Sequence, residues 1–440
     1  MKTSKLALAT MGATLLGATT LPPTAHAQQS DALLNKLVDK GILTTKEAEE
    51  LRKESDQGFT KAYQAKSGMP DWVTSFKFNG DFRPRYEAQW SDNPLAIQRD
   101  RFRYRLRLGL TATLKDNFEV GMRLTSGDSP TGFTTGNPLS GSSTMQDNAS
   151  RKGVFLDLAY AKWSAPKGSD WSGGVTVGKM ENPFAFSQVM FDPDYTPEGL
   201  AGQVAYKFND QHSLRFVGGG FVLDEVAGNS SDPFMVGGQL IWDAKWSERL
   251  QSSLGVGGLT ITAQKKLTAV TVPDVNRGNT RLTGTDVLAA SFTPIVTDAW
   301  LTYTLDSFPI YQGHFPIKFG GEYIYNPRAA AMNTAFATGV TFGKAGKKGQ
   351  WEVSYQYRYI EADSWFEELP DDDFNGFYVT GTAYRGGTNL RGHVAKVSYS
   401  VLDSLMFNFL FYAGELINNP NPGNSSSQAG HVLVDLVWKF

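Results

Sequence analysis

The chain has 440 residues, with 45 glycines, 12% aromatic residues, no cysteine and a formal net charge of −2. Without cysteine, the sequence excludes a disulfide framework, a Cys-ligated zinc site, an iron–sulfur cluster and a covalently attached haem. The near-neutral charge argues against a nucleic-acid-binding protein, which is usually basic. Glycine and aromatic residues are spread along the whole chain, and this favours one large all-β unit.

Residues 1–27 have the pattern of a secretory signal peptide. Two lysines precede an uncharged run over residues 6–21, and Ala25-His26-Ala27 forms a small-x-small cleavage site. The alternative is an uncleaved anchor helix, but the run is too short and too polar for a good membrane span. We therefore expect export, with a mature chain that begins at Gln28.

Residues 28–70 are predicted to form a periplasmic leader of two short helices. Ser30 can cap the first helix, Gly41 can end it, and Thr44 with Glu47 forms a capping box for the second. The apolar stripes are too narrow to form a core alone, so the helices need a partner, such as other copies of themselves in an oligomer. A partly ordered leader without a binding role is the alternative. The stripes consist of Leu33, Leu34, Leu37 and Val38, then Ala48 and Leu51.

From residue 76 onward the pattern changes to strict alternation of apolar and polar residues, which predicts strands. In a soluble sandwich the apolar face would pack on a second sheet, and in a membrane barrel it would meet lipid. Membrane strands need about 9–11 residues, whereas soluble strands usually have about 5–6. The segments here favour a barrel. Sixteen candidates follow, at about 72–90, 99–115, 117–126, 153–164, 172–180, 199–209, 211–223, 233–246, 248–263, 297–306, 314–326, 333–343, 349–362, 388–400, 403–416 and 429–440.

The connections between these segments alternate in length. Tight turns such as Asp116-Asn117 and Leu402-Asp403 alternate with long polar loops at 127–152, 181–198, 224–232, 264–296 and 363–387. Bacterial outer-membrane barrels have short periplasmic turns, long external loops and an even strand number. Residues 71–440 are therefore predicted to form an all-β, transmembrane, antiparallel up-and-down barrel of 16 strands in the outer membrane of a Gram-negative bacterium.

The last strand carries the most specific signal. Its apolar residues alternate up to Trp438 and the terminal Phe440. A terminal Phe after such a strand resembles the signal by which the outer-membrane assembly machinery recognises its barrels. We expect that machinery, outer-membrane lipid and lipopolysaccharide as partners.

Several stretches together resemble the bacterial putative-porin family of outer-membrane channels. By this resemblance the protein is a diffusion channel for small hydrophilic solutes, and similar porins are often homotrimers. The stretches are Leu33-Leu34 with Leu37-Val38-x-Lys40-Gly41-x-Leu43-Thr44, Arg101-Phe102-Arg103-Tyr104-Arg105-Leu106-Arg107, Gly178-Lys179-Met180-x-Asn182-Pro183-Phe184, Asp192-Pro193-Asp194-x-x-Pro197-Glu198-Gly199, Glu322-Tyr323-x-x-Asn326, Tyr355-x-Tyr357-Arg358-Tyr359-x-Glu361-Ala362 and Arg391-Gly392-His393.

The polar face of the first three strands is strongly basic. Successive arginines on one face lie about 7 Å apart, close to the Debye length of about 8 Å, so their fields overlap. A one-signed wall attracts solutes of opposite charge and predicts anion preference. The alternative is that acidic residues of an infolded loop pair with the arginines and stiffen the wall. This face has three acidic residues, Asp81, Glu87 and Glu119, and eight basic ones, which is an excess of five positive charges. The expected channel-lining cations are Lys77, Arg83, Arg85, Arg101, Arg103, Arg105, Arg107 and Arg123.

The loop at 181–198 is the candidate constriction. In sixteen-stranded porins the third long loop folds into the lumen and narrows it, and this segment occupies the same ordinal position. Its acidic residues Glu181, Asp192, Asp194 and Glu198 could face the basic wall, or they could be ordinary solvated loop charges. A second acidic segment contains Glu367-Glu368 and Asp371-Asp372-Asp373. Its carboxylates could bind calcium, but a solvated external loop is the simpler prediction.

Catalysis is not expected. The mature chain keeps four histidines, but no Gly-x-Ser-x-Gly motif accompanies them and no His pair has metal-ligand spacing. We expect no cofactor or metal. The alternatives to a channel are a secreted β-rich carbohydrate-binding or scaffold protein and an outer-membrane anchor barrel with a plugged lumen.

Overall fold

The computed structural model describes most of the barrel and parts of the leader. The described residues are 34, 36–40, 43–51, 53, 70–93, 98–128, 140–166, 168, 170–268, 277–377, 384–419 and 426–440. The expected signal peptide and the expected caps Ser30 and Gly41 lie outside these residues.

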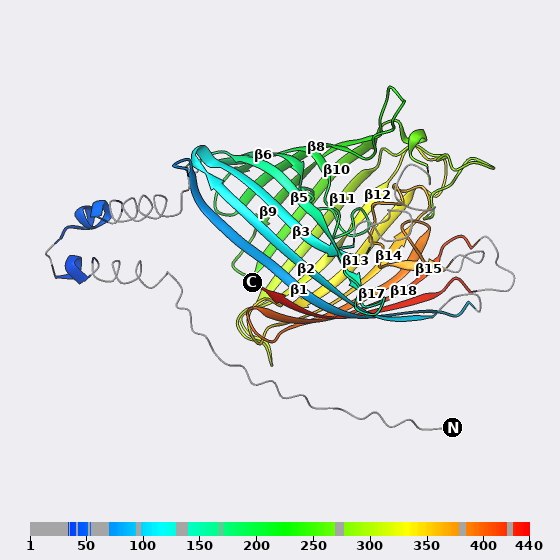
Figure 1. The fold of residues 1–440 in the computed structure, drawn as a ribbon. Helices are drawn as coiled ribbons and strands as arrows, with labels where there is room; N and C mark the ends of the chain where they lie inside the picture. The colour runs from blue at the N-terminus through cyan, green and yellow to red at the C-terminus, as the bar shows by residue number, and fades with distance from the viewer. Residues whose placement is uncertain are drawn as a thin grey trace. The chain divides into compact units, whose positions relative to one another are not determined.

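Sixteen long antiparallel strands form the barrel (Figure 1). Each lies within about two residues of the range predicted from the alternation, because period-two patterning and turn residues are both local signals. The strands are β1 (Val73–Ser91), β2 (Arg99–Leu114), β3 (Phe118–Gly127), β5 (Gly153–Ser164), β6 (Trp171–Lys179), β7 (Glu198–Lys207), β8 (His212–Val222), β9 (Phe234–Lys245), β10 (Leu250–Ile261), β11 (Ile295–Leu305), β12 (Phe315–Tyr325), β13 (Thr334–Gly343), β14 (Trp351–Ile360), β17 (Leu390–Ser400), β18 (Leu405–Leu416) and β19 (Ala429–Lys439).

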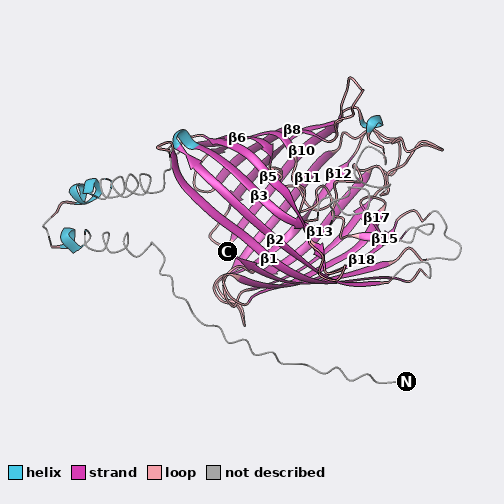
Figure 2. Cartoon of the chain, viewed as in Figure 1, coloured by secondary structure: helices cyan, strands magenta, loops and turns pink. Residues whose placement is uncertain are grey.

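Three minor strands and two short 3-10 helices complete the described elements of the barrel (Figure 2). The two-residue strand β4 (Ser143–Thr144) pairs with β2, and β15 (Asn375–Phe377) pairs with β16 (Tyr384–Gly386) in a separate hairpin. The first 3-10 helix, η1 (Lys115–Asn117), is the predicted tight turn between β2 and β3, and the second is η2 (Gln264–Lys266). In η1, Asp116 and Asn117 have φ values of 61° and 65°, a region that short polar side chains tolerate well.

The barrel closes because β1 pairs with β2 on one side and with β19 on the other. The terminal residue extends this seam. Gly80 donates a backbone hydrogen bond to the Phe440 carbonyl at 2.8 Å, and Phe440 donates one back to Gly80 at 3.1 Å. Closure satisfies the backbone groups that an open sheet edge would leave unpaired, which is the requirement for crossing lipid with strands.

The two faces of the wall are the ones that the alternation predicts. Phe78 and Phe102 point outward and are 66% and 60% exposed, whereas Arg85 and Arg103 point inward and are 7% exposed each. The interior differs from the prediction at its outer end, where long loops fold inward around an apolar cluster that includes Met190, Phe292, Trp365 and Phe366. Periodicity cannot predict this cluster, because it joins loops that are distant in sequence.

The leader is described only in part. Residues 36–39 and 45–51 are helical, and the predicted capping box is present. The Thr44 backbone N–H donates to Glu47 Oε2 at 2.8 Å, and the Glu47 N–H donates to Thr44 Oγ1 at 3.3 Å. Within the described ranges, no helix has both the length and the apolar character of a membrane span.

The seam generates a test of barrel closure. A Cβ atom at Gly80 would lie 2.4 Å from the Arg107 carbonyl oxygen and 2.6 Å from the Phe440 ring. Gly80→Ala should therefore destabilise the folded barrel by about 1–3 kcal/mol, measured as the fraction that keeps heat-modifiable gel mobility at increasing urea. Gly220→Ala is the matched control, since the atom nearest to its added Cβ, on the Val236 side chain, would lie 3.8 Å away. Equal stability of the two variants would contradict the role of the seam.

Candidate functional site

The site is the constricted part of the lumen, where the loop between β6 and β7 meets the inner wall. We call residues 180–197 the constriction loop. We call Arg83, Arg85, Arg101, Arg103, Arg105, Arg107 and Arg123 the arginine ladder; they lie on β1, β2 and β3.

The register of β1 and β2 places like charges directly opposite each other. Arg83 lies opposite Arg105, and Arg85 lies opposite Arg103. Like charges across a strand pair repel, so this arrangement needs anions from elsewhere in the fold.

Acidic residues from the closing strand and from the ladder's own strands supply part of this charge. Asp435 on β19 accepts two hydrogen bonds from Arg85, at 2.7 and 2.9 Å. Glu87 pairs with Arg101 and, at 3.1 Å, with Arg103. The Arg85–Asp435 pair crosses the seam between the first and last strands, and the Glu87 pairs join β1 to β2.

A β-bulge supplies another carboxylate. The pairing of β3 with β5 skips Asp157, because Arg123 lies opposite Leu158 and Leu124 lies opposite Leu156. A bulge turns its extra side chain away from the regular alternation. Here Asp157 reaches the Arg123 Nε atom at 2.5 Å and the Arg107 Nε atom at 3.6 Å.

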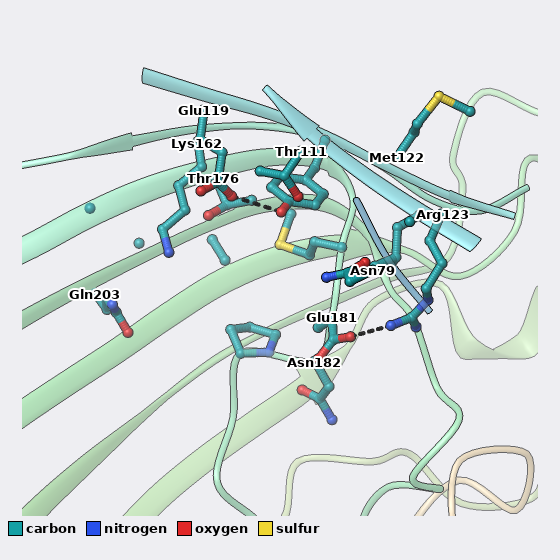
Figure 3. A pocket seen from close by; sticks show the side chains of 18 residues that line it. Asn79, Thr111, Glu119, Met122, Arg123, Lys162, Thr176, Glu181, Asn182 and Gln203 are labelled. Carbon is teal, nitrogen blue, oxygen red and sulfur yellow. Dashed lines mark hydrogen bonds and ion pairs between the residues drawn. The ribbon is translucent and has the colours of Figure 1, made fainter. Parts of the chain in front are cut away.

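The constriction loop contributes two acidic anchors. Asp194 Oδ1 lies 2.6 Å from Arg107 Nη2 and 3.3 Å from Arg105 Nη1. Glu181 lies 2.5 Å from Arg123 Nη1, a contact drawn in Figure 3. Burial would raise the pKa of Asp194, but Arg107 and Arg105 outweigh it and lower the pKa to about 2. Asp194 is therefore ionised throughout the physiological range.

These pairs change the charge of the predicted wall. Each ladder arginine has a carboxylate within 4.0 Å, and the seven arginines meet seven acids: Asp81, Glu87, Asp157, Glu181, Asp194, Asp373 and Asp435. The excess of five that three strands alone would carry is thus cancelled locally. The arginines face inward as predicted, but loops and acidic side chains cover them, so the alternative of a stiffened wall describes these residues better.

The other predicted site residues lie apart from this network. Lys77 is exposed on β1. The Asp192 carboxylate accepts the N–H groups of Asp194 and Asp372 rather than a ladder arginine, and Glu198 pairs with Lys179 at 3.0 Å at the ends of β7 and β6. Of the four acidic residues predicted for the constriction, two contact the ladder. Trp438, on the last strand, packs its ring against Phe82 of β1. The ring of the terminal Phe440 lies beside Gly80, also on β1.

The opposite side of the constriction loop is fixed to the far wall. Ser187 donates through its N–H and its hydroxyl to Glu322 on β12, at 2.8 and 2.7 Å. The Ala185 N–H donates to Gln239 on β9 at 2.9 Å. Val189, Met190 and Phe191 are buried in the apolar cluster. The loop therefore spans the lumen, with ion pairs at one wall and mainly apolar packing at the other.

A second inward segment, residues 361–374, packs on the constriction loop, and we call it the outer loop. Its acidic residues are not a solvated surface patch, which corrects the simpler prediction made for them. Glu367 is fully buried, pairs with Arg281 and accepts the Asn279 N–H at 2.5 Å. Asp371 pairs with Arg358 on β14 at 2.6 Å. The aromatic residues interspersed with these acids bury the segment, and Trp365 and Phe366 were the signal available in the sequence.

Two polar chambers lie along the inner wall. One of about 420 Å³ is lined by Asn79, Thr111, Glu119, Arg123, Lys162 and Gln203 among others (Figure 3). The other, of about 730 Å³, is lined by residues of both charge signs, including Arg215, Asp243, Asp298 and Lys318. Charged and amide side chains thus lie beside apolar ones in the lining of both chambers.

The buried Arg358–Asp371 pair generates a test of how the outer loop is held. Arg358→Met leaves the Asp371 carboxylate buried without its main partner, and this should cost about 3–5 kcal/mol. Urea unfolding in detergent, followed by intrinsic tryptophan fluorescence, measures the loss. The double variant Arg358→Met with Asp371→Leu should recover most of it, since it removes the uncompensated charge. Failure of the double variant to recover would contradict this account.

Known proteins resemble this chain to different degrees. Similar solved structures include OprB of Pseudomonas putida at high pH, with a TM-score of 0.49, 12% identity and coverage of 88% of this chain and 97% of that chain. OmpT of Vibrio cholerae has a TM-score of 0.44 and 10% identity, with 84% and 100% covered. No curated protein matches.

A family model described as "Putative porin" matches residues 91–269 and 314–440, more than half of the chain. The chain therefore belongs to the putative-porin family, and its barrel is an outer-membrane barrel of the porin type.

Proposed function

We propose that the protein is a non-enzymatic channel through which small hydrophilic solutes cross the outer membrane by passive diffusion. The observation that carries the proposal is the constriction loop, which spans the lumen between the arginine ladder and Glu322 and leaves polar chambers beside it. A loop held at both walls narrows a barrel without filling it. Polar lining then gives hydrated solutes a path that apolar molecules would not prefer.

The charge pairing argues for weak ion selectivity. An anion preference depends on cationic groups whose charge is not cancelled nearby. Because seven acids neutralise the ladder, we propose that the predicted preference for anions is small, and that it is set by how firmly Asp194 holds Arg105 and Arg107.

Planar-bilayer recording tests the channel itself. Purified protein should produce stepwise increases of conductance, and the reversal potential under a salt gradient should lie near zero with a small shift in the anion direction. Absence of steps from protein with heat-modifiable gel mobility would contradict the proposal.

A charge variant tests the origin of selectivity. Asp194→Asn removes the negative charge shared by Arg105 and Arg107, so it should shift the reversal potential toward the anion limit. Arg107→Gln should shift it in the opposite direction. Asp306→Asn is the matched control, because it removes an equal charge from an exposed position where the partner is Arg249. An unchanged reversal potential in all three variants would show that the ladder does not set selectivity.

A plugged anchor barrel is the second candidate. The observation in its favour is the apolar cluster, in which Trp365, Phe366 and Phe292 of inward segments pack together within the barrel. A permanent plug predicts a folded barrel with no conductance under any condition. The same bilayer recording therefore separates the two functions.

We propose lipopolysaccharide and outer-membrane lipid as the surroundings of the apolar outer face, and a homotrimer as the assembly. Chemical cross-linking of the protein in native membranes tests the assembly, with a band of three chains as the expected product.

A further inference from the structure

The constriction loop and the outer loop are joined by a continuous interface. The Asp192 N–H donates to the Leu369 carbonyl at 2.6 Å, and the Asp371 N–H donates to the Gln188 carbonyl at 3.0 Å. The Trp365 indole N–H donates to the Met190 carbonyl, also at 3.0 Å. Two loops that are far apart in sequence therefore behave as one layer across the lumen.

Three carboxyl groups meet at this interface. Oxygens of Asp192, Asp371 and Asp372 lie within 4.8 Å of one another. Asp192 accepts the Asp194 N–H at 2.7 Å with one oxygen and the Asp372 N–H at 3.2 Å with the other. Arg358 balances Asp371. The Asp192 and Asp372 carboxyl groups thus oppose each other across the two loops.

Charged and titratable groups reach this cluster from several elements. Asp194 is on the same loop as Asp192, and Asp373 is on the same loop as Asp372. The groups on other elements are Arg277 near Asp372, Arg358 and Tyr412 near Asp371, Arg85 and His431 near Asp373, and Arg83, Arg105 and Arg107 near Asp194.

Burial and like charge favour the protonated form of the opposed pair. Burial, then Asp372, raises the pKa of Asp192 well above its ordinary value. Burial, then Asp373, raises the pKa of Asp372 to about 7, although Arg277 opposes this. Undocked loops would expose both groups to water, where their pKa values return to normal. Docking is therefore favoured at low pH and is opposed as pH rises through about 7.

We propose that Asp192 and Asp372 form a proton-dependent latch that holds the outer loop on the constriction loop and releases it as pH rises. In the docked state the two loops narrow the passage, and in the released state the outer loop no longer covers it. The effect on conductance rests on the proposed channel function. The movement of the outer loop does not, so the two can be tested separately.

Single-channel recording from roughly pH 5.5 to roughly pH 8.5 tests the effect on conductance. The ratio of low- to high-conductance states should fall by up to about tenfold per pH unit as pH rises toward about 7, because docking takes up one proton in that range, and it should level off above it, where Asp372 is ionised in both states. Asp372→Asn cannot ionise and its amide can donate to Asp192. This variant should therefore stay in the low-conductance state at every pH.

Two control variants distinguish the latch from other titrating groups. Asp306→Asn removes one exposed carboxylate at the Arg249 pair and should keep the wild-type pH response. Unperturbed histidine titrates near neutral pH, so His431→Gln tests the histidine near Asp373 and should also keep the response. A response lost in His431→Gln but kept in Asp372→Asn would overturn the latch.

Cysteine accessibility tests the loop movement without any current. The chain has no cysteine, so Leu369→Cys at a 3% exposed position and Ile310→Cys at a 93% exposed position give single labelling sites. The rate of maleimide labelling at 369, divided by the rate at 310, should rise with pH and stay flat when Asp372→Asn is added. A flat ratio without that substitution overturns the latch. A rising ratio in a barrel that shows no current supports the latch and contradicts the channel.

Discussion

Paired arginines on the inner wall are the constraint on which the rest of the interior depends. Facing lipid, each such charge would cost about 2–4 kcal/mol near the membrane midplane, so β1 and β2 are held in the register that turns them inward. Inside, the register sets Arg83 against Arg105 and Arg85 against Arg103. Buried like charges require compensation. Asp435, Asp157 and Asp194 supply it from a closing strand, a bulge and a loop, so the ladder fixes the seam, the wall and the constriction at once.

Because of this arrangement, the constriction loop is held by different interactions at its two walls. At the ladder it is held by ionised carboxylates, and at the far wall by buried residues such as Met190 and by the Ser187–Glu322 hydrogen bonds. Ion pairs restrict the orientation of the loop, whereas apolar burial supplies most of the attraction, at about 25 cal/mol per Å² of apolar surface. The loop is consequently part of the wall, and its charges cannot be assigned to a solute path without their partners.

The strands and their faces were predictable because alternation, turn residues and the terminal Phe440 are local signals. The charge of the lumen was not. Asp435 becomes a neighbour of Arg85 only when the barrel closes, and Asp157, at a bulge in the pairing of β3 with β5, reaches Arg107 across strands that are separate in sequence. The acidic run at Asp371 looked like a solvated loop, since charge alone does not report burial. Trp365 and Phe366 just before it were the features that favoured an inward position.

Two carboxylates on the same loop show how environment divides their roles. Asp194 and Asp192 are separated by a single proline residue, Pro193. Asp194 faces Arg107 and Arg105, which hold its pKa at about 2, so it anchors the loop at any physiological pH. Asp192 faces Asp372, and burial with that like charge raises its pKa. Pairs of acids whose environments push their pKa values apart commonly serve different purposes. One loop therefore carries a permanent attachment to the wall and a second attachment that depends on protons, and the second can release without loss of the first.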